Sequence, residues 1–233
     1  MRGECQSCDS PPMICWLNLE RLSVLRSNHE GARLAQRPTE NEMTGNAVPT
    51  EMPVVFFTIG HSTRSFEEFV GLLQTVGVQL LVDVRTVPRS RRNPQFNREA
   101  LPAALTDFKI GYEHLAALGG LRGHKRDVSP AVNGFWQNPS FHNYADYAMT
   151  EEFRTGLVML RYLGHQSPTA IMCAEAVWWQ CHRRIIADYL LAANEIVFHI
   201  MNGGRVQRAE MTQGAKRESD EILTYPALLR PSA

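Results

Sequence analysis

The sequence predicts an α/β fold of three layers, in which a mainly parallel sheet is flanked by helices. Short apolar runs rich in β-forming residues alternate with segments of helical periodicity from residue 54 to about residue 201. Two such runs, 54–59 and 79–84, enclose a helical segment, and a β-α-β unit of this length implies a right-handed crossover between parallel strands. We therefore expect the carboxyl ends of several strands to share one edge of the sheet, where open α/β proteins build their sites.

The first β-α-β unit carries clear start and stop signals. Val54–Ile59 is a continuous apolar run that ends at Gly60, which suits a strand buried on both faces. Ser65 and Glu68 have the spacing of a capping box, and apolar residues follow at helical spacing until Gly77. The segment from 65 to 77 is therefore expected to be a helix that packs one face on the sheet.

The elements after the second strand follow from the same two periodicities. Residues 85–97 form a loop rich in proline and arginine, and Asn97 can cap the next helix, whose first turn is limited by Pro102. Farther along the chain we expect a third strand within 110–118, a helix over 144–163, a strand over 169–173, a helix over 180–193 and a last strand over 196–201.

The chain divides into three segments. Residues 1–52 show no sustained periodicity, and we expect either a disordered N-terminal extension or a segment that precedes the true start at Met43 or Met52. Residues 53–202 form the α/β domain, and residues 203–233 form a polar C-terminal tail on the surface. Cys5 and Cys8 have the spacing of zinc ligands, but without a second close pair they predict no zinc site.

Composition excludes several classes of protein. The formal net charge of zero gives no global basic field for nucleic acid, although a local basic patch remains open. No apolar run approaches the roughly 18 to 20 residues that cross a bilayer, so no membrane association is expected. Five cysteines without a recognisable export signal predict reduced thiols and a cytoplasmic protein.

Polar motifs at the predicted strand ends resemble one known family. Its motifs occur in order between Val54 and Ile200, and so many ordered matches make the resemblance specific. They are Thr58-Ile59-Gly60-His61-Ser62, Val82-Asp83-Val84-Arg85 with Pro88, Ser90, Arg91, Pro94 and Phe96, Tyr112-Glu113-His114-Leu115 with Leu118-Gly119-Gly120, Tyr144-Ala145-Asp146-Tyr147, Met172-Cys173-Ala174-Glu175 and Cys181-His182-Arg183. The chain resembles the DUF488 family, a domain of unknown function, and the resemblance implies a fold and a motif set but no reaction.

The chain departs from the family pattern in two places. Val177-Trp178-Trp179 is apolar where the family is usually polar, and Ala209 stands where a histidine is expected shortly before Thr212. If that histidine takes part in the family's chemistry, its absence weakens a transfer of that chemistry to this chain.

Two thiols suggest reactive chemistry at the edge of the sheet. Cys173 lies at a strand end, and Cys181 lies in the first turn of a predicted helix, whose N-terminus favours a thiolate. Arg183, or His182 when protonated, would add to this effect. The pair can serve as a nucleophile or as a redox couple, and the alternative is two small residues buried at a strand–helix junction.

A metal interpretation would use Cys173, Cys181, His182 and also Glu175, whose atom types suit zinc. However, adjacent residues on a helix point about 100° apart, so Cys181 and His182 should not both face one ion. We therefore expect no metal.

Charged residues at the strand ends need partners. Unpaired burial of Asp83, Arg85 or Glu175 would cost several kcal/mol, so each should pair with another or with a ligand. A purely structural Asp83–Arg183 or Glu175–Arg85 bridge is the alternative. Loop 85–98 is rich in arginines, whose guanidinium forks suit phosphate or carboxylate. The alternative for this loop is a solvated surface.

The remaining candidates carry weaker signals. His61 beside Ser62 suits a general base near a hydroxyl, although Ser62 can instead cap the helix and His61 can bond its neighbours. Tyr112 and Tyr147 can stack on a flat ligand, although aromatic residues are more often core.

These observations together favour a cytoplasmic enzyme with a Cys/Glu/Arg pocket at the strand carboxyl ends, acting on a nucleotide, nucleic acid or phosphorylated metabolite. The catalytic candidates are Cys173, Glu175, Cys181, His182, Asp83 and His61; the substrate-binding candidates are Arg85, Ser90, Arg91, Arg183, Ser62, Tyr112 and Tyr147. No motif names a cofactor, and neither a dinucleotide fingerprint nor a P-loop is present. The alternatives are a non-catalytic nucleic-acid-binding module and a Cys173/Cys181 redox sensor. The oligomeric state does not follow from the sequence.

Overall fold

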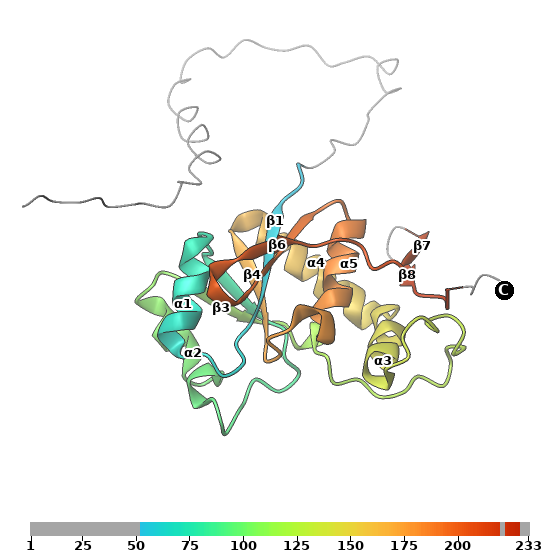
Figure 1. Cartoon of the computed structure of the whole chain (residues 1–233), viewed down its shortest axis with the longest axis horizontal. Helices are drawn as coiled ribbons and strands as arrows, with labels where there is room; N and C mark the ends of the chain where they lie inside the picture. The colour runs from blue at the N-terminus through green and yellow to red at the C-terminus, as the bar shows by residue number, and fades with distance from the viewer. Residues whose placement is uncertain (1–51, 220–221, 229–233) are drawn as a thin grey trace, which may run out of the picture. The chain divides into compact units, whose positions relative to one another are not determined.

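A six-stranded sheet forms the centre of the molecule, in the order β3-β2-β4-β1-β5-β6 (Figure 1). The computed structural model describes residues 52–219 and 222–228. The strands are β1 (Val55–Gly60), β2 (Leu80–Asp83), β3 (Gly111–His114), β4 (Thr169–Cys173), β5 (Ile196–Ile200) and β6 (Val206–Arg208). The first five run parallel and β6 is antiparallel to β5, which confirms the predicted mainly parallel sheet.

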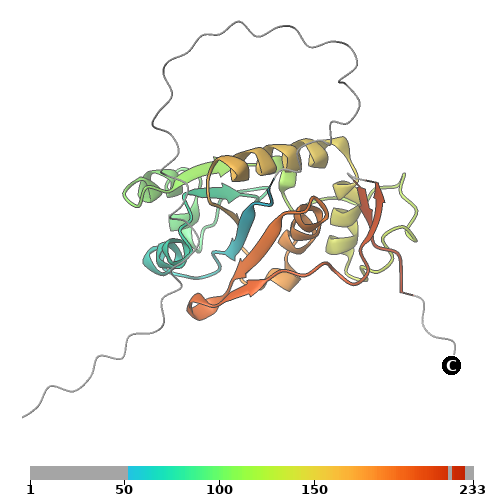
Figure 2. The same cartoon turned by 90° about the horizontal axis from the view of Figure 1, so that it is seen from above.

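Helices cover both faces of this sheet (Figures 1 and 2). On one face α1 (Phe66–Thr75) and α2 (Leu101–Thr106) pack on apolar side chains that include Ile59 and Leu81. The other face holds a second core, on which α3 (Pro139–Ala148), α4 (Glu151–Gln166) and α5 (Arg183–Ala192) pack. Short 3-10 helices lie at η1 (Pro94–Phe96), η2 (Ala116–Leu118), η3 (Trp178–Gln180) and η4 (Asn202–Gly204). The three predicted layers are therefore present. None of the helices in the described ranges is both long and apolar enough for a membrane span.

Several elements begin and end where the sequence predicts. The Ser65 side chain accepts a hydrogen bond from the Glu68 amide, which satisfies one of the free donors at the start of α1. Gly77 follows that helix with a φ of +69°, a left-handed conformation that favours glycine. Strand β4 has the predicted bounds and is buried along its whole length.

Three predicted elements differ from the structure. The single helix expected over 144–163 is two helices, because Asn138 caps α3 before Pro139 and Thr150 caps α4. The strand expected within 110–118 is shorter, since the chain turns into η2 after β3. The helix expected from 180 begins only at Arg183, and this difference changes the geometry of the site.

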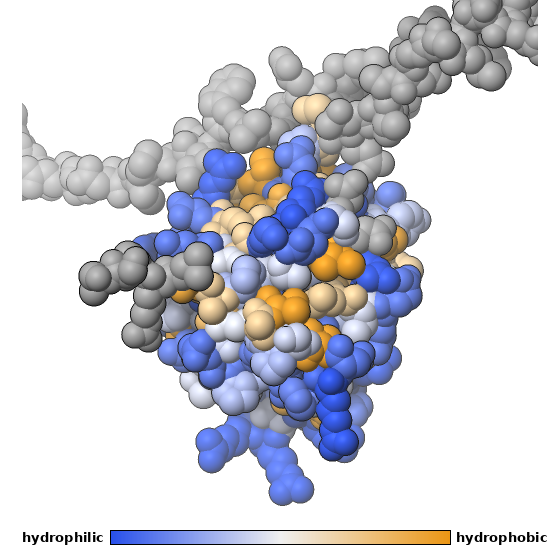
Figure 3. Space-filling view, turned by 90° about the vertical axis from the view of Figure 1, so that its right-hand side faces the viewer, coloured by the Kyte–Doolittle hydropathy of each residue, from blue (hydrophilic) through white to orange (hydrophobic). Residues whose placement is uncertain are grey.

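The segment after Asn202 exposes most of its described residues, but it also forms strands and places Ala209, Leu223 and Tyr225 in the core. Strand β6 extends the sheet, and β7 (Lys216–Ser219) pairs with β8 (Ile222–Thr224). Tyr225 is 0% exposed, and its backbone exchanges hydrogen bonds with Val132 and Phe135. Figure 3 views the side that carries α3 and the β7–β8 pair, where hydrophobic residues form small groups among hydrophilic ones. The extension predicted for residues 1–52 lies outside the described ranges, except for Met52.

The chain leaves the neighbouring strands β1 and β4 toward opposite faces of the sheet. The helix that follows β1 covers one face of the sheet, and the helix that follows β4 covers the other. The segments that follow β1 and β4 stay paired beyond the strands. The His61 amide donates to the Cys173 carbonyl and the Ser62 amide donates to the Ala174 carbonyl, each at 2.9 Å. Connections that leave neighbouring strands toward opposite faces mark the edge at which open α/β sheets hold ligands.

Candidate functional site

A pocket of about 310 Å³ lies at the carboxyl ends of β2 and β4. Five stretches of chain that are remote in sequence form its wall. They are 85–87 after β2, Gly120 and Leu121 after η2, Ser140 and Phe141 at the start of α3, 173–175 after β4, and 180–182 before α5. The predicted gathering of strand-end residues at one edge therefore brings Arg85, Cys173 and Glu175 into one wall.

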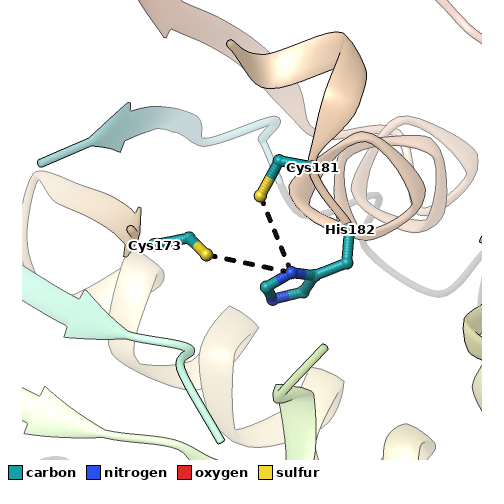
Figure 4. A group of neighbouring side chains, drawn as sticks. All are labelled: Cys173, Cys181 and His182. Atoms are coloured by element: carbon teal, nitrogen blue, oxygen red, sulfur yellow. Dashed lines mark hydrogen bonds between the residues drawn. The ribbon is translucent and has the colours of Figure 1, made fainter. Parts of the chain in front are cut away.

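Two thiols and an imidazole meet in this wall, and we refer to Cys173, Cys181 and His182 as the thiol–imidazole cluster (Figure 4). His182 Nδ1 lies 3.9 Å from Cys173 Sγ and 3.6 Å from Cys181 Sγ. The three atoms all lie within 4.8 Å of one another. Both cysteines are free thiols and both are buried.

The contact of the other ring nitrogen, Nε2, determines which nitrogen of His182 carries the proton. His182 Nε2 lies 3.1 Å from the carbonyl oxygen of Val84, which can only accept a hydrogen bond. Nε2 therefore carries the proton, and in the neutral ring the Nδ1 lone pair faces the two sulfurs. A backbone group of β2 thus orients an imidazole that arrives from α5.

Cys181 and His182 both face one point because Cys181 is not helical. Its backbone is extended, with a φ of −125° and a ψ of 145°, whereas His182 is the N-cap of α5. The predicted helix from 180 would have turned their side chains about 100° apart. That prediction was wrong at Cys181, so the geometric objection to a shared ligand does not hold.

The Arg183 side chain points into the protein and contacts the cluster. It is 1% exposed, its Nε lies 3.3 Å from Cys181 Sγ, and its Nη2 donates to the Glu175 carbonyl. Arg183 is not among the residues that line the pocket. Its contacts position Cys181 and the turn after β4, whereas the sequence predicts that it holds an anionic substrate.

The two thiols differ in their readiness to ionise. A hydrogen bond to Cys181 and burial raise the pKa of Cys173 well above its ordinary value. Burial opposes ionisation of Cys181 as well, yet the Cys173 hydrogen bond and the positive charge of Arg183 lower the pKa of Cys181 well below its ordinary value. If one proton is lost from the pair, it leaves Cys181.

Asp83, Arg85 and His61 form a closed network beside the pocket. The Arg85 guanidinium donates to both oxygens of the fully buried Asp83 carboxylate and to the Phe96 carbonyl. His61 Nδ1 faces the Ser62 carbonyl and therefore carries the proton, which leaves Nε2 to accept from Arg85 Nη1 at 3.0 Å. Neither of the structural bridges that the sequence suggests, Asp83–Arg183 or Glu175–Arg85, is formed; Asp83 pairs with Arg85 instead.

This network limits the chemistry of two predicted catalytic groups. Burial lowers the pKa of His61 to about 4, and its remaining lone pair is occupied by Arg85. Asp83 accepts a further hydrogen bond from Tyr112, so both of its oxygens are engaged. Of the three, only Arg85 lines the pocket, and Asp83 and His61 serve to hold it.

The other predicted substrate-binding residues do not line the pocket. Ser62 follows β1 in a left-handed conformation with a φ of 49°, and the helix cap is Ser65 instead. Tyr147 donates to the Ala117 carbonyl and stacks beneath Arg122. Ser90 is half-buried in loop 85–98, and Arg91 is exposed in the same loop.

Sequence reasoning missed several contributors to the pocket. Ser140 and Phe141 begin α3, and the pair Asn138-Pro139, an N-cap followed by a first-turn proline, is the signal that would have placed them there. The Val84 carbonyl carries no sequence signal. Only glycine fits at position 120 beside His182, because a Cβ there would lie 2.4 Å from His182 Nδ1.

The comparison with protein families agrees with this architecture. The model of "Domain of unknown function DUF488" matches residues 65–190, more than half of the chain. The chain belongs to the DUF488 family. The matched segment includes the whole thiol–imidazole cluster, whereas the His61 motif precedes it. A search of the curated proteins and a search of the solved structures each gave no significant match.

Proposed function

We propose that this DUF488 protein is an enzyme that acts on a small anionic molecule, such as a nucleotide or a phosphorylated metabolite, bound in the pocket at the ends of β2 and β4. One observation carries the proposal: the thiol–imidazole cluster forms part of the wall of a pocket of about 310 Å³. Oriented sulfur and nitrogen atoms beside an open cavity are the arrangement that catalysis requires. The cluster supplies the reactive groups, and Glu175, exposed at the rim, is available to move protons.

The size of the pocket supports a small substrate. Ligand pockets usually measure about 300 to 1,000 Å³, and this one lies at the lower end of that range. Val87 and Leu121 are 60% and 75% exposed and give the rim an apolar surface. A cavity of this kind suits a metabolite or a mononucleotide better than a strand of nucleic acid, which counts against a simple nucleic-acid-binding module.

The charge around the pocket supports an anion. Arg85 lines the wall, and the loop that follows it carries the exposed Arg91, Arg92 and Arg98. Within 52–219 and 222–228, none of these three forms a salt bridge with a carboxylate. Exposed guanidinium groups attract phosphate and carboxylate groups.

The proposal is tested by turnover. The full chain is assayed against mononucleotides, sugar phosphates and small phosphorylated acids, beside its Cys173→Ser, Cys181→Ser and Glu175→Gln variants. We expect Cys181→Ser to lower kcat by roughly 100-fold or more, since the cluster supplies the reactive groups. Leu121→Ala should raise KM with little change in kcat. The control is Val158→Ala, which replaces another exposed apolar residue, on α4, and should change neither.

Two outcomes would contradict the proposal. Full activity in both cysteine variants would remove the cluster from the chemistry. Binding of an oligonucleotide that weakens steeply with salt, is lost in Arg91→Ala and persists in both cysteine variants would favour the nucleic-acid-binding module instead.

A second candidate function, a thiol redox sensor, is favoured by the separation of the sulfurs, which is at most 4.8 Å. It predicts that mild peroxide joins Cys173 to Cys181 in the folded protein, and that dithiothreitol reverses the bond. Both cysteines lie in one tryptic peptide, 162–183, so mass spectrometry after oxidation and alkylation would detect the bond as that peptide lacking two hydrogens and both alkyl groups. Alkylation of both thiols after oxidation would exclude this role.

A further inference from the structure

We propose that the thiol–imidazole cluster is a site for a divalent metal ion of zinc type, bound by Cys173 Sγ, Cys181 Sγ and His182 Nδ1 with a fourth position open to the pocket. The inference deepens the proposed function, from which it takes only the location of the reactive centre. Metal binding is measured without turnover, so the two proposals can fail separately.

The spacing of the three atoms fits a tetrahedral ion. Zinc binds thiolate sulfur at about 2.3 Å and imidazole nitrogen at about 2.0 Å, which places sulfur and nitrogen about 3.5 Å apart and two sulfurs about 3.8 Å apart. The observed sulfur-to-nitrogen distances are 3.6 and 3.9 Å, and all three atoms lie within 4.8 Å of one another. The sulfur-to-nitrogen distances need to shorten by a few tenths of an ångström at most, and the two sulfurs, which are at most 4.8 Å apart, would approach each other by up to about 1 Å to complete the coordination.

The imidazole is already in the state that a metal requires. The Val84 carbonyl holds the proton on Nε2, so Nδ1 presents a lone pair to the space between the sulfurs. Metal-bound histidines usually donate their second ring nitrogen in this way, which orients the ring and strengthens the ligand. Here the orienting carbonyl belongs to β2 and the histidine to the start of α5.

The sulfurs have supporting contacts of the same kind. Arg183 Nε lies against Cys181 Sγ, and the Glu175 amide supports the Cys173 sulfur. Two thiolates balance the charge of a divalent ion, so the buried cluster becomes neutral when the ion replaces the thiol protons. No carboxylate is needed, which agrees with Glu175 Oε1 accepting from the Val177 amide instead of facing the sulfurs.

The open fourth coordination position is typical of a catalytic metal site and not of a structural one. Structural zinc sites are closed by four protein ligands, whereas catalytic sites use three and leave one position for water or substrate. Among the described residues, the cluster offers three ligand atoms, and all three residues line the pocket. An ion there would polarise a phosphate or carbonyl oxygen of a substrate in that pocket.

The first experiment is a Co²⁺ titration of the full chain, from which a chelator has first removed any bound metal under reducing conditions. We expect one Co²⁺ per chain, with the intense visible bands of tetrahedral cobalt and the ultraviolet charge-transfer band of thiolate ligands, and displacement by Zn²⁺. Because Cys5, Cys8 and Cys15 are also thiols, the triple serine variant at those positions is the matched control and should bind equally well.

Variants of the cluster decide between a built site and chance binding. Cys173→Ser and Cys181→Ser should each remove much of the charge-transfer band, and His182→Asn should weaken Co²⁺ binding by at least roughly 100-fold. Gly120→Ala leaves every ligand in place but crowds His182 Nδ1, so it should weaken binding by roughly 10-fold or more. Gly123→Ala, with no atom within 4 Å of the added methyl, should bind as the parent does.

Three results would overturn the metal site. They are the absence of a tetrahedral cobalt spectrum in the parent chain, a spectrum that the cluster variants leave unchanged, and a spectrum that only the triple serine variant loses. Full turnover by the stripped protein would also refute a metal role while leaving the proposed enzyme intact. Stoichiometric, variant-sensitive cobalt binding supports the site even if no substrate is turned over.

Discussion

Gly60 is the residue on which the turn beside the pocket depends most. A Cβ at this position would lie 1.9 Å from the carbonyl oxygen of Glu175, and a backbone atom cannot rotate out of the way. The same carbonyl accepts a hydrogen bond from Arg183, so a displaced turn would also disturb Cys181. We expect Gly60→Ala to lower the free energy of unfolding by roughly 1 to 3 kcal/mol, measured from urea unfolding curves.

The matched control for this prediction is Gly71, in the middle of α1, where an added Cβ meets no atom within 4 Å. Alanine loses less backbone entropy than glycine when a helix forms, so Gly71→Ala should stabilise the protein by roughly 0.5 to 1 kcal/mol. If both variants destabilise the protein equally, the close approach at Gly60 is not the cause.

Residue identities predicted part of the site, and the structure sorted their roles. Cys173, Glu175 and Arg85 were placed at one edge because parallel strands end there, and all three line the pocket. The roles of His61 and Arg183 could not be deduced, because each depends on which partner occupies a buried polar atom. Pairing of that kind arises from tertiary structure, which a pattern of residue types does not encode.

At the scale of single elements, α1 shows how a local signal determines a helix start. The Ser65 side chain accepts from the Glu68 amide at 3.1 Å, and Glu67 and Glu68 place negative charge at the helix N-terminus. Ser65→Ala should cost about 1 kcal/mol of stability, seen as a lower midpoint of urea unfolding. Thr63→Ala, an exposed neighbour outside the cap, should shift the midpoint little, and an equal shift would argue against capping.

The start of α5 shows the opposite case, in which tertiary contacts override a periodic pattern. The helical spacing over 180–193 is real, but Trp178 stacks on His199 at 4.1 Å and the His182 ring bonds the Val84 carbonyl. These contacts keep Cys181 extended and delay the helix to Arg183. The predicted helix started three residues too early, at 180 instead of Arg183. That difference alone led to the wrong conclusion that Cys181 and His182 cannot face the same ion.

At the scale of the whole molecule, the strand alternation predicted the layers and the parallel sheet but not the role of the C-terminal segment. The segment has too few buried apolar residues, too unevenly spaced, to form an apolar period. The buried residues described in it are Ala209, Thr212, Gly214, Leu223, Thr224 and Tyr225. Their burial depends on partners in α5, since Asp188 accepts from the Thr212 amide and from the Tyr225 hydroxyl. One buried carboxyl group therefore adds to the backbone hydrogen bonds of β6 and Tyr225 that hold a segment of polar composition to the core.

That carboxyl group should make the stability of the protein depend on pH. Burial raises the pKa of Asp188 to about 6, and the hydrogen bonds from Thr212 and Tyr225 and the charge of Arg184 oppose this rise only in part. The folded state thus binds a proton more tightly than the unfolded state, whose aspartate has a pKa near 3.8. The stabilising contribution is complete below about pH 4 and is lost as the pH rises through about 6, a change on the order of 2 to 3 kcal/mol.

Substitution of Asp188 by asparagine isolates this contribution from those of the other carboxylates. Urea unfolding of the parent and of Asp188→Asn between pH 4 and pH 7.5 should show a stability difference that moves in favour of the variant as the pH rises. Tyr225→Phe removes a hydrogen bond that favours the Asp188 carboxylate, so its cost should be larger at pH 7.5 than at pH 4. Parallel profiles for the parent and Asp188→Asn would mean that Asp188 has the same proton affinity in the folded and unfolded states, which would contradict the prediction.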